Sequence, residues 1–294
     1  MNYYFIPGTG IYGGIKVACR FAELLTRLDA PCCIATPDGA APSWLQSSVS
    51  VLSQDNALSA ARSSDNILFS LPHDYPRLRT APSRLVFHCQ GTDPLIDPIL
   101  TDPGVALLSC WPQATSYIKE KSGRQPIEVG LPISPCFFYR GAPKRAGTVA
   151  FMPRRGAEIA EACRALLPGL QFLPIDGATE DHTARLLQSA EFFLATAVNE
   201  WFGLPAFEAM AAGCVVLSVP VLGGMDYLVD GDNALVTEPQ HMPERLAWIS
   251  DPGRRLLRAQ LRDRGIVTAQ AFRLLECERR LALLLAGELS YLRA

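Results

Sequence analysis

Short apolar runs that end in small or turn-forming residues alternate along the chain with longer segments of helical period. The run Tyr3–Ile6, for example, precedes residues 14–28, in which Ile15, Phe21 and Leu25 fall on one helical face. This alternation is typical of a parallel sheet whose strands are joined by helices. In the first half, strands are predicted at residues 3–6, 32–35, 49–52, 67–71, 85–88, 105–109 and 127–129.

The pattern is interrupted between residues 130 and 147, which contain three prolines and no sustained periodicity. We therefore predict an N-terminal Rossmann-like domain at residues 1–131, a linker at 132–146 and a C-terminal Rossmann-like domain at 147–294.

The alternation then resumes, with strands predicted at 148–152, 171–174, 192–196, 214–219 and 234–237 and helices at 158–167, 179–188 and 205–212. From residue 243 the chain is predicted to be helical, with breaks near 251–253 and 265. The fold class is thus α/β, with two sheets. Ligands of such sheets bind beyond the carboxyl ends of the strands.

Composition supports a folded chain and excludes some partners. Of 294 residues, 49% are hydrophobic and 19% are charged, which is enough apolar material for a sizeable core. The net charge of −2 gives no reason to expect nucleic acid binding, which needs a concentrated basic face.

The nine cysteines are odd in number, lie mostly in apolar runs and show no C-x-x-C spacing. We interpret them as buried free thiols of a reducing cytosol. The sequence has no targeting signal at its start and no apolar run long enough to span a bilayer. A cytoplasmic protein is predicted, and peripheral contact with the inner face of the membrane is left open.

The strongest motif follows the predicted strand 192–196 and reads Glu-Trp-Phe-Gly-Leu-Pro-Ala-Phe-Glu at residues 200–208. Pro205 suits the first turn of a helix and Gly213 suits its C-terminal cap. The amides of residues 202–204 would then point at an anion, and diphosphate is the obvious candidate.

Two carboxylates flank the start of this helix. Glu200 precedes it and Glu208 lies about one turn inside it, so they could reach hydroxyls on either side of a diphosphate. The alternative is that Glu200 only caps the helix and that Glu208 is a solvated helix carboxylate.

The motif is followed by Ala-Met-Ala-Ala-Gly-Cys-Val-Val and then by residues 221–236, which contain a Gly-Gly turn and an Asp-Gly-Asp-Asn segment. This whole stretch resembles the donor-binding signature of family 4 retaining glycosyltransferases. These enzymes have the GT-B fold, in which two Rossmann-like domains face each other across a cleft. By analogy with them, the final helix, residues 269–294, is expected to cross back towards the first domain. The sequence departs from the usual signature at Trp201, where glycine is typical, at Val215, where proline is common, and at Ala234, where glycine is frequent.

The resemblance implies a role for each residue of the motif. Glu200 would be catalytic, hydrogen-bonding the hydroxyls of the transferred sugar. Phe202, Gly203 and Leu204 would hold the diphosphate by their amides, and Glu208 would bind the ribose. Trp201 would lie beside the donor and narrow the sugar pocket.

Arg154 and Arg155 follow the predicted strand 148–152 and are also candidates for donor binding, because a guanidinium group offers a fixed fork of donors to a phosphate. The related enzymes carry an Arg and a separate Lys in this loop, whereas here the two arginines are adjacent. The alternative is that both face solvent.

Gly13 and Gly14 lie in a glycine-rich loop after the first strand, and similar transferases carry a Gly-Gly here that faces the donor phosphate. The loop lacks the spacing of the dinucleotide fingerprint, so an NAD site is not favoured, and a purely structural turn is the alternative.

His88 ends the predicted strand 85–88. The related family often places a histidine there against the donor sugar, so His88 is the second catalytic candidate. The alternative is that His88 is a structural histidine that only forms hydrogen bonds. No D-x-D pair ends a strand, so neither a metal site nor metal dependence is predicted.

Together these features predict a retaining glycosyltransferase that moves a sugar from a nucleotide-diphosphate sugar to an acceptor hydroxyl, with no cofactor beyond this donor substrate. The first half is short for the fold, which suggests an open acceptor site suited to surface polysaccharide or a lipid-linked saccharide. The alternatives are a nucleotide-sugar epimerase of the same fold and a catalytically degenerate GT-B binding subunit.

Overall fold

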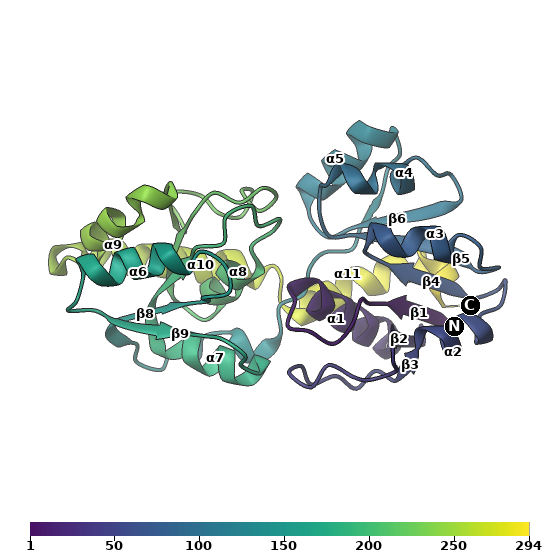
Figure 1. Cartoon of the computed structure of the whole chain (residues 1–294), viewed down its shortest axis with the longest axis horizontal. Helices are drawn as coiled ribbons and strands as arrows, with labels where there is room; N and C mark the ends of the chain where they lie inside the picture. The colour runs from purple at the N-terminus through teal and green to yellow at the C-terminus, as the bar shows by residue number, and fades with distance from the viewer. Residues whose placement is uncertain (294) are drawn as a thin grey trace. The chain divides into compact units, whose positions relative to one another are not determined.

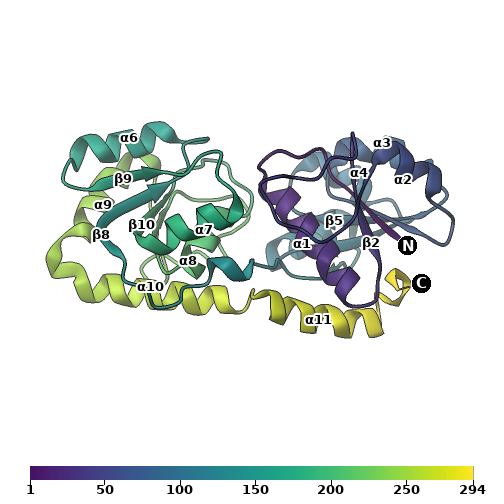
Figure 2. The ribbon, with the colours of Figure 1, turned by 90° about the horizontal axis from the view of Figure 1, so that it is seen from below.

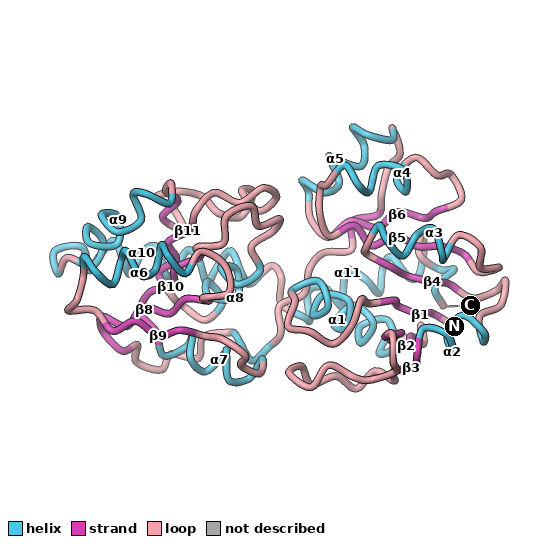
Figure 3. The backbone as a smooth tube through the Cα atoms, in the orientation of Figure 1, coloured by secondary structure: helices cyan, strands magenta, loops and turns pink. Residues whose placement is uncertain are grey.

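The computed structural model describes residues 1–293 and divides the chain into two compact units. Unit 1 comprises Met1–Pro132 and the chain from Leu274 onward, and unit 2 comprises Ile133–Arg273. Each unit is a parallel sheet with helices packed on it (Figures 1 and 3). The predicted α/β fold class is confirmed.

The sheet of unit 1 has seven strands among the described residues, in the order β3-β2-β1-β4-β5-β6-β7. All neighbouring strands run parallel, and β1, β2 and β4 are buried along their whole length, as expected when helices cover both faces. The strands are β1 (Asn2–Phe5), β2 (Cys32–Thr36), β3 (Val51–Ser53), β4 (Asn66–Phe69), β5 (Arg84–Cys89), β6 (Val105–Ser109) and β7 (Ile127–Glu128).

The helices of unit 1 come from both ends of the chain. Helix α11 lies along α1 (Figure 2), and its residues Cys277, Leu281 and Leu285 share one apolar core with Phe21 of α1. The C-terminal segment is therefore part of the core of unit 1. The helices are α1 (Gly13–Arg27), α2 (Gln54–Ala60), α3 (Tyr75–Leu78), α4 (Asp97–Leu100), α5 (Pro112–Ser122) and α11 (Leu274–Ala286).

A buried pair of asparagines fastens the C-terminal segment to the sheet. The side-chain amide of Asn2 donates to the carbonyl of Leu292 at 2.7 Å and to that of Pro31 at 3.0 Å. Asn66, on the neighbouring strand, donates to Asn2 Oδ1 at 2.9 Å and to the carbonyl of Tyr291 at 3.1 Å. Both side chains are almost fully buried, so these bonds replace the water that the amides lose on folding.

Unit 2 has a five-stranded parallel sheet among the described residues, in the order β12-β11-β10-β8-β9. The stretch expected to be a linker contributes to this unit, because the amide of Tyr139 donates to the carbonyl of Ala211. The elements are β8 (Arg145–Phe151), α6 (Ala157–Leu166), β9 (Gln171–Pro174), α7 (Glu180–Ser189), β10 (Ala190–Ala195), α8 (Leu204–Ala211), β11 (Val215–Ser218), β12 (Leu235–Val236), α9 (Met242–Ser250) and α10 (Arg255–Gln270).

The break predicted near residue 265 is wrong, because α10 runs through Gly265 without interruption. A Cβ at this glycine would lie 3.3 Å from Met210 Cγ and 3.4 Å from the carbonyl oxygen of Asn233. The glycine therefore permits close packing of α10 on α8 and does not end the helix. The interruption falls later, at residues 271–273, before α11 begins.

The cysteines form no disulfide, and all nine lie within the described part of the chain. Eight of them are buried, as the sequence predicts. Over residues 1–293, no helix combines the length and the apolar character that crossing a membrane requires.

We expect Asn2→Ala to lower the free energy of unfolding of unit 1 by about 1–3 kcal/mol, because it leaves the carbonyl of Leu292 and the amide of Asn66 buried without this partner. Urea denaturation followed by fluorescence measures the change. Asn56→Ala, at an exposed position of α2, is the matched control and should stay within about 0.5 kcal/mol of the wild type. Equal stability of the two variants would contradict the anchoring role.

Candidate functional site

The candidate site lies in unit 2, where β8 and β10 end side by side. Strand β9 pairs with one edge of β8, and β10, which follows β9 along the chain, pairs with the other edge of β8. This reversal of strand order is where open α/β sheets bind ligands. The loop after β8 carries Arg154 and Arg155, and the loop after β10 carries Glu200.

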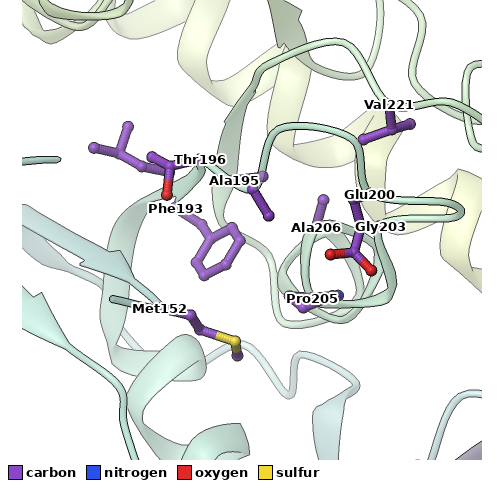
Figure 4. Close-up of a pocket in the computed structure, with 11 residues that line it drawn as sticks. Met152, Phe193, Ala195, Thr196, Glu200, Gly203, Pro205, Ala206 and Val221 are labelled. Carbon is purple, nitrogen blue, oxygen red and sulfur yellow. The ribbon is translucent and has the colours of Figure 1, made fainter. Parts of the chain in front are cut away.

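A small pocket of about 40 Å³ opens at this edge of the sheet. Figure 4 shows the Glu200 carboxylate above the first turn of α8, near Pro205, with Met152 and Thr196 entering from the ends of β8 and β10. Glu200 is the ionisable residue in the wall of this pocket. The full lining is Met152, Phe193, Leu194, Ala195, Thr196, Ala197, Glu200, Gly203, Pro205, Ala206 and Val221.

The turn into α8 has the conformation that the motif predicts. Gly203 is the N-cap residue and has a left-handed backbone, with φ of 80°, which favours glycine. Pro205 lies in the first turn, and the helix spans Leu204–Ala211, one residue before the predicted bounds. The first amides of an α-helix have no partner within the helix, so this end of α8 can present N–H groups to an anion.

A cluster of buried aromatic rings supports this turn from below. The ring centroid of Tyr227 lies 4.9 Å from that of Phe202 and 4.6 Å from that of Phe207. The Tyr227 hydroxyl donates a 2.8 Å hydrogen bond to the carbonyl of Gly203. Burial raises the pKa of Tyr227 well above its usual value, and the nearby carboxylates of Glu200 and Glu208 add to the effect, so the hydroxyl remains a donor.

Sequence reasoning did not identify Tyr227 as a support for the site. The residue lies in the segment after the Gly-Gly turn, and only the folded chain places its hydroxyl on Gly203. The side chain of Phe202 points into the same aromatic cluster and is 6% exposed. Only the backbone of Phe202 is therefore placed to face a ligand.

Glu200 forms an ion pair with Arg155, with 2.9 Å between Oε2 and Nη1. The loop that carries Arg155 is fixed by Thr196, whose hydroxyl donates to the carbonyl of Arg155 at 3.0 Å. Because the Arg155 side chain is half exposed, the ion pair is weak and a competing anion can displace the carboxylate. The structure thus distinguishes the two adjacent arginines, since the pairing with Glu200 involves Arg155.

The other predicted residues of unit 2 lie close to this turn. Glu208 lies on α8 and is only 3% exposed, so the alternative of a solvated helix carboxylate is wrong. Trp201 is partly exposed, and its carbonyl accepts a hydrogen bond from the amide of Gly223. The Gly-Gly turn at residues 223–224 is therefore hydrogen-bonded to the backbone of Trp201.

The remaining predicted residues belong to unit 1. Gly13 and Gly14 begin α1. His88 has no exposed surface, and its ring nitrogens hydrogen-bond the hydroxyl of Tyr4 and the thiol of Cys110. This geometry fits the structural alternative for His88, and its contact with a donor sugar stays a prediction.

Residues 171–252 match the family model described as Glycosyl transferases group 1, and this range includes the motif of residues 200–208. The matched range lies entirely within unit 2. The resemblance that the motif indicates is confirmed, and so is the GT-B fold. No curated protein matches the chain.

Several solved structures have a similar fold. Anabaena HepE, in complex with UDP and glucose, has a TM-score of 0.74 at 12% identity, covering 97% of this chain and 99% of that one. Sucrose-phosphate synthase from Thermosynechococcus elongatus has a TM-score of 0.71 at 15% identity, covering 98% and 99%. The pneumococcal O-GlcNAc transferase GtfA has a TM-score of 0.61 at 14% identity, covering 81% and 60%. At these identities the similarity establishes the fold.

We expect Gly156→Ala to be severely destabilising for the glycosyltransferase. Gly156 has φ of 71°, and a Cβ there would lie 2.1 Å from the carbonyl oxygen of Thr196. Gly177→Ala is a matched control, because Gly177 has φ of 58° but nothing within 4 Å of the added atom. Both variants carry a left-handed penalty of about 1–2 kcal/mol, and the steric clash should cost Gly156→Ala on the order of 1–3 kcal/mol more. Equal losses in thermal or urea denaturation would contradict the close approach of the two loops.

Proposed function

We propose that the glycosyltransferase moves a sugar from a nucleotide-diphosphate sugar to an acceptor hydroxyl and retains the anomeric configuration. The Glu200 carboxylate carries this proposal, because it lies in the wall of a pocket at the start of α8 and forms an ion pair with Arg155. A carboxylate accepts hydrogen bonds from sugar hydroxyls, and a guanidinium group binds phosphate.

Donor binding exchanges the partners of Arg155. The diphosphate takes the guanidinium of Arg155 from Glu200, together with the amides at the start of α8. Glu200 is then available to the hydroxyls of the transferred sugar. Glu208 is proposed to bind the ribose hydroxyls, with Arg154 a second phosphate ligand.

The transfer step needs no group beyond the two substrates and these residues. The acceptor oxygen forms its bond to the anomeric carbon on the face from which the phosphate oxygen leaves. The proton of the acceptor hydroxyl passes to that departing phosphate oxygen. The positive charge of the arginine and the dipole of α8 stabilise the negative charge that develops on the diphosphate.

The relatives support a nucleotide-sugar donor. HepE has been solved in complex with UDP and glucose and with UDP-glucose, and GtfA in complex with UDP and GlcNAc. We therefore propose a uridine diphosphate sugar as the first donor to test. A surface polysaccharide or glycolipid is the proposed acceptor class, and the reaction is proposed to proceed without a metal.

Glu200→Gln is expected to lower the transfer rate by at least about 100-fold, the scale of one lost electrostatic contact in a transition state. The affinity for UDP should be unchanged or higher, because the variant no longer holds Arg155 in an ion pair. Product formation by mass spectrometry and calorimetry with UDP measure the two effects. Glu161→Gln, which breaks an exposed ion pair on α6, is the control and should behave as the wild type. Normal transfer by Glu200→Gln, or epimerised nucleotide sugar formed without acceptor, would refute the proposal.

Arg155→Ala should weaken UDP binding by about 1.5–3 kcal/mol, the contribution of charged hydrogen bonds, and the affinity should not depend on added EDTA. Calorimetry of the wild type, Arg154→Ala and Arg155→Ala separates the two arginines. An unchanged affinity in the Arg155 variant would remove this residue from the phosphate site.

A further inference from the structure

A line of hydrogen-bonded side chains runs through unit 1 from its core to the carboxyl edge of its sheet. The Sγ atom of Cys110 lies 3.0 Å from His88 Nε2, and the hydroxyl of Tyr4 lies 2.8 Å from His88 Nδ1. Gln90 Nε2 donates to the same hydroxyl at 3.1 Å. Cys110, His88 and Tyr4 are fully buried, whereas Gln90, the residue after β5, is partly exposed.

His88 is held in the neutral form in the middle of this line. Burial lowers the pKa of His88 to about 3, so at neutral pH one ring nitrogen carries a hydrogen and the other accepts one. Both nitrogens already have partners inside the core. The ring therefore links the orientation of the hydrogen bond to Cys110 with that of the hydrogen bond to Tyr4.

Tyr4 joins two polar side chains, His88 and Gln90, at one hydroxyl. Burial raises the pKa of Tyr4 well above its usual value, so the hydroxyl keeps its hydrogen. When the single phenolic hydrogen is donated to His88 Nδ1, the Tyr4 oxygen can only accept from its other neighbours. This arrangement requires Gln90 to turn its NH₂ group towards Tyr4.

The carboxamide oxygen of Gln90 is consequently turned away from Tyr4 and lies over the start of α1. It is 2.8 Å from the position that a Cβ on Gly14 would occupy, so the glycine leaves the room that this oxygen fills. Among the described residues, this oxygen has no hydrogen-bond partner, although the amide nitrogen of the same side chain has one. An oriented acceptor thus stands at the edge of the sheet where ligands of such folds bind.

We propose that Gln90 is a substrate-contacting residue of this transferase and that Tyr4 and His88 are its positioning residues. Its Oε1 atom accepts a hydrogen bond from a hydroxyl of the saccharide acceptor. A phosphate oxygen is not its ligand, because a carboxamide oxygen and a phosphate are both acceptors. The inference rests on the proposed transfer function and extends it to a residue outside the motif.

Calorimetry with three probes tests this assignment on the intact protein. Gln90→Ala should leave the affinity for UDP unchanged. It should also leave the affinity for UDP-glucose unchanged, and weaken the binding of glucose, as an acceptor probe, to the UDP-loaded protein. A loss of about 3- to 10-fold in the glucose arm is expected for one neutral hydrogen bond. Gln125→Ala, an exposed glutamine just before β7 at the opposite edge of the sheet, is the matched control.

The positioning role is tested by a double-mutant cycle between Tyr4 and Gln90. Tyr4→Phe should produce part of the loss seen in Gln90→Ala, and should produce no further loss of affinity in the Gln90→Ala background. Tyr4→Phe should lower the melting temperature less in the Gln90→Ala background than in the wild type, because the hydrogen bond from Gln90 to Tyr4 is already absent there. Additive losses of affinity would overturn the positioning role.

An unchanged affinity of Gln90→Ala for glucose would overturn the assignment of Gln90. A wild-type protein that binds none of UDP, GDP, ADP and dTDP would refute the proposed function itself. The two failures are therefore distinguishable, because the UDP arm does not involve Gln90.

Discussion

The hydrogen bonding of β8 to β10 is the constraint on which the candidate site depends. The two strands pair in parallel from Val149 opposite Phe192 to Phe151 opposite Leu194, although β9 separates them along the chain. Both strands thus end at one edge, and the loops that follow them must share the same space. A Cβ on Gly156 would lie 2.1 Å from the carbonyl oxygen of Thr196, which is too close for any side chain. The pairing of Arg155 with Glu200 is a consequence of this close approach.

The electrostatics of the site follow from how unequally its charged groups are buried. Arg155 and Glu200 remain partly exposed, so their attraction is screened by solvent and costs little to break. Tyr227 and Glu208, in contrast, are buried. The groups proposed to exchange partners on donor binding are therefore the exposed ones, while the buried Tyr227 hydroxyl holds the turn at Gly203 in place.

The sequence alone predicts much of this architecture but not all of its contacts. The apolar runs locate the strands within a few residues, and the motif at Glu200 indicates the family, because both depend on local patterns. Gly265 was misread as a helix break, since its role is to admit Met210 from α8. The support given by Tyr227 and the pairing of Arg155 with Glu200 were also beyond local reasoning, because both join segments that are far apart in sequence.

His88 illustrates the same limit in unit 1. Its place at the end of β5 favours a ligand-facing role, but alternate residues of a strand share one face and only the last of them reaches the edge. His88 therefore lies inside the sheet, and Gln90, two residues later, lies where the strand has ended. A buried imidazole with two partners loses its interactions with water and is tolerated because the line from Cys110 to Tyr4 replaces them. Stability alone does not explain why Cys110, His88 and Tyr4 form a buried polar line, since apolar side chains would stabilise the core equally well. The orientation that this line gives to the partly exposed Gln90 explains it better.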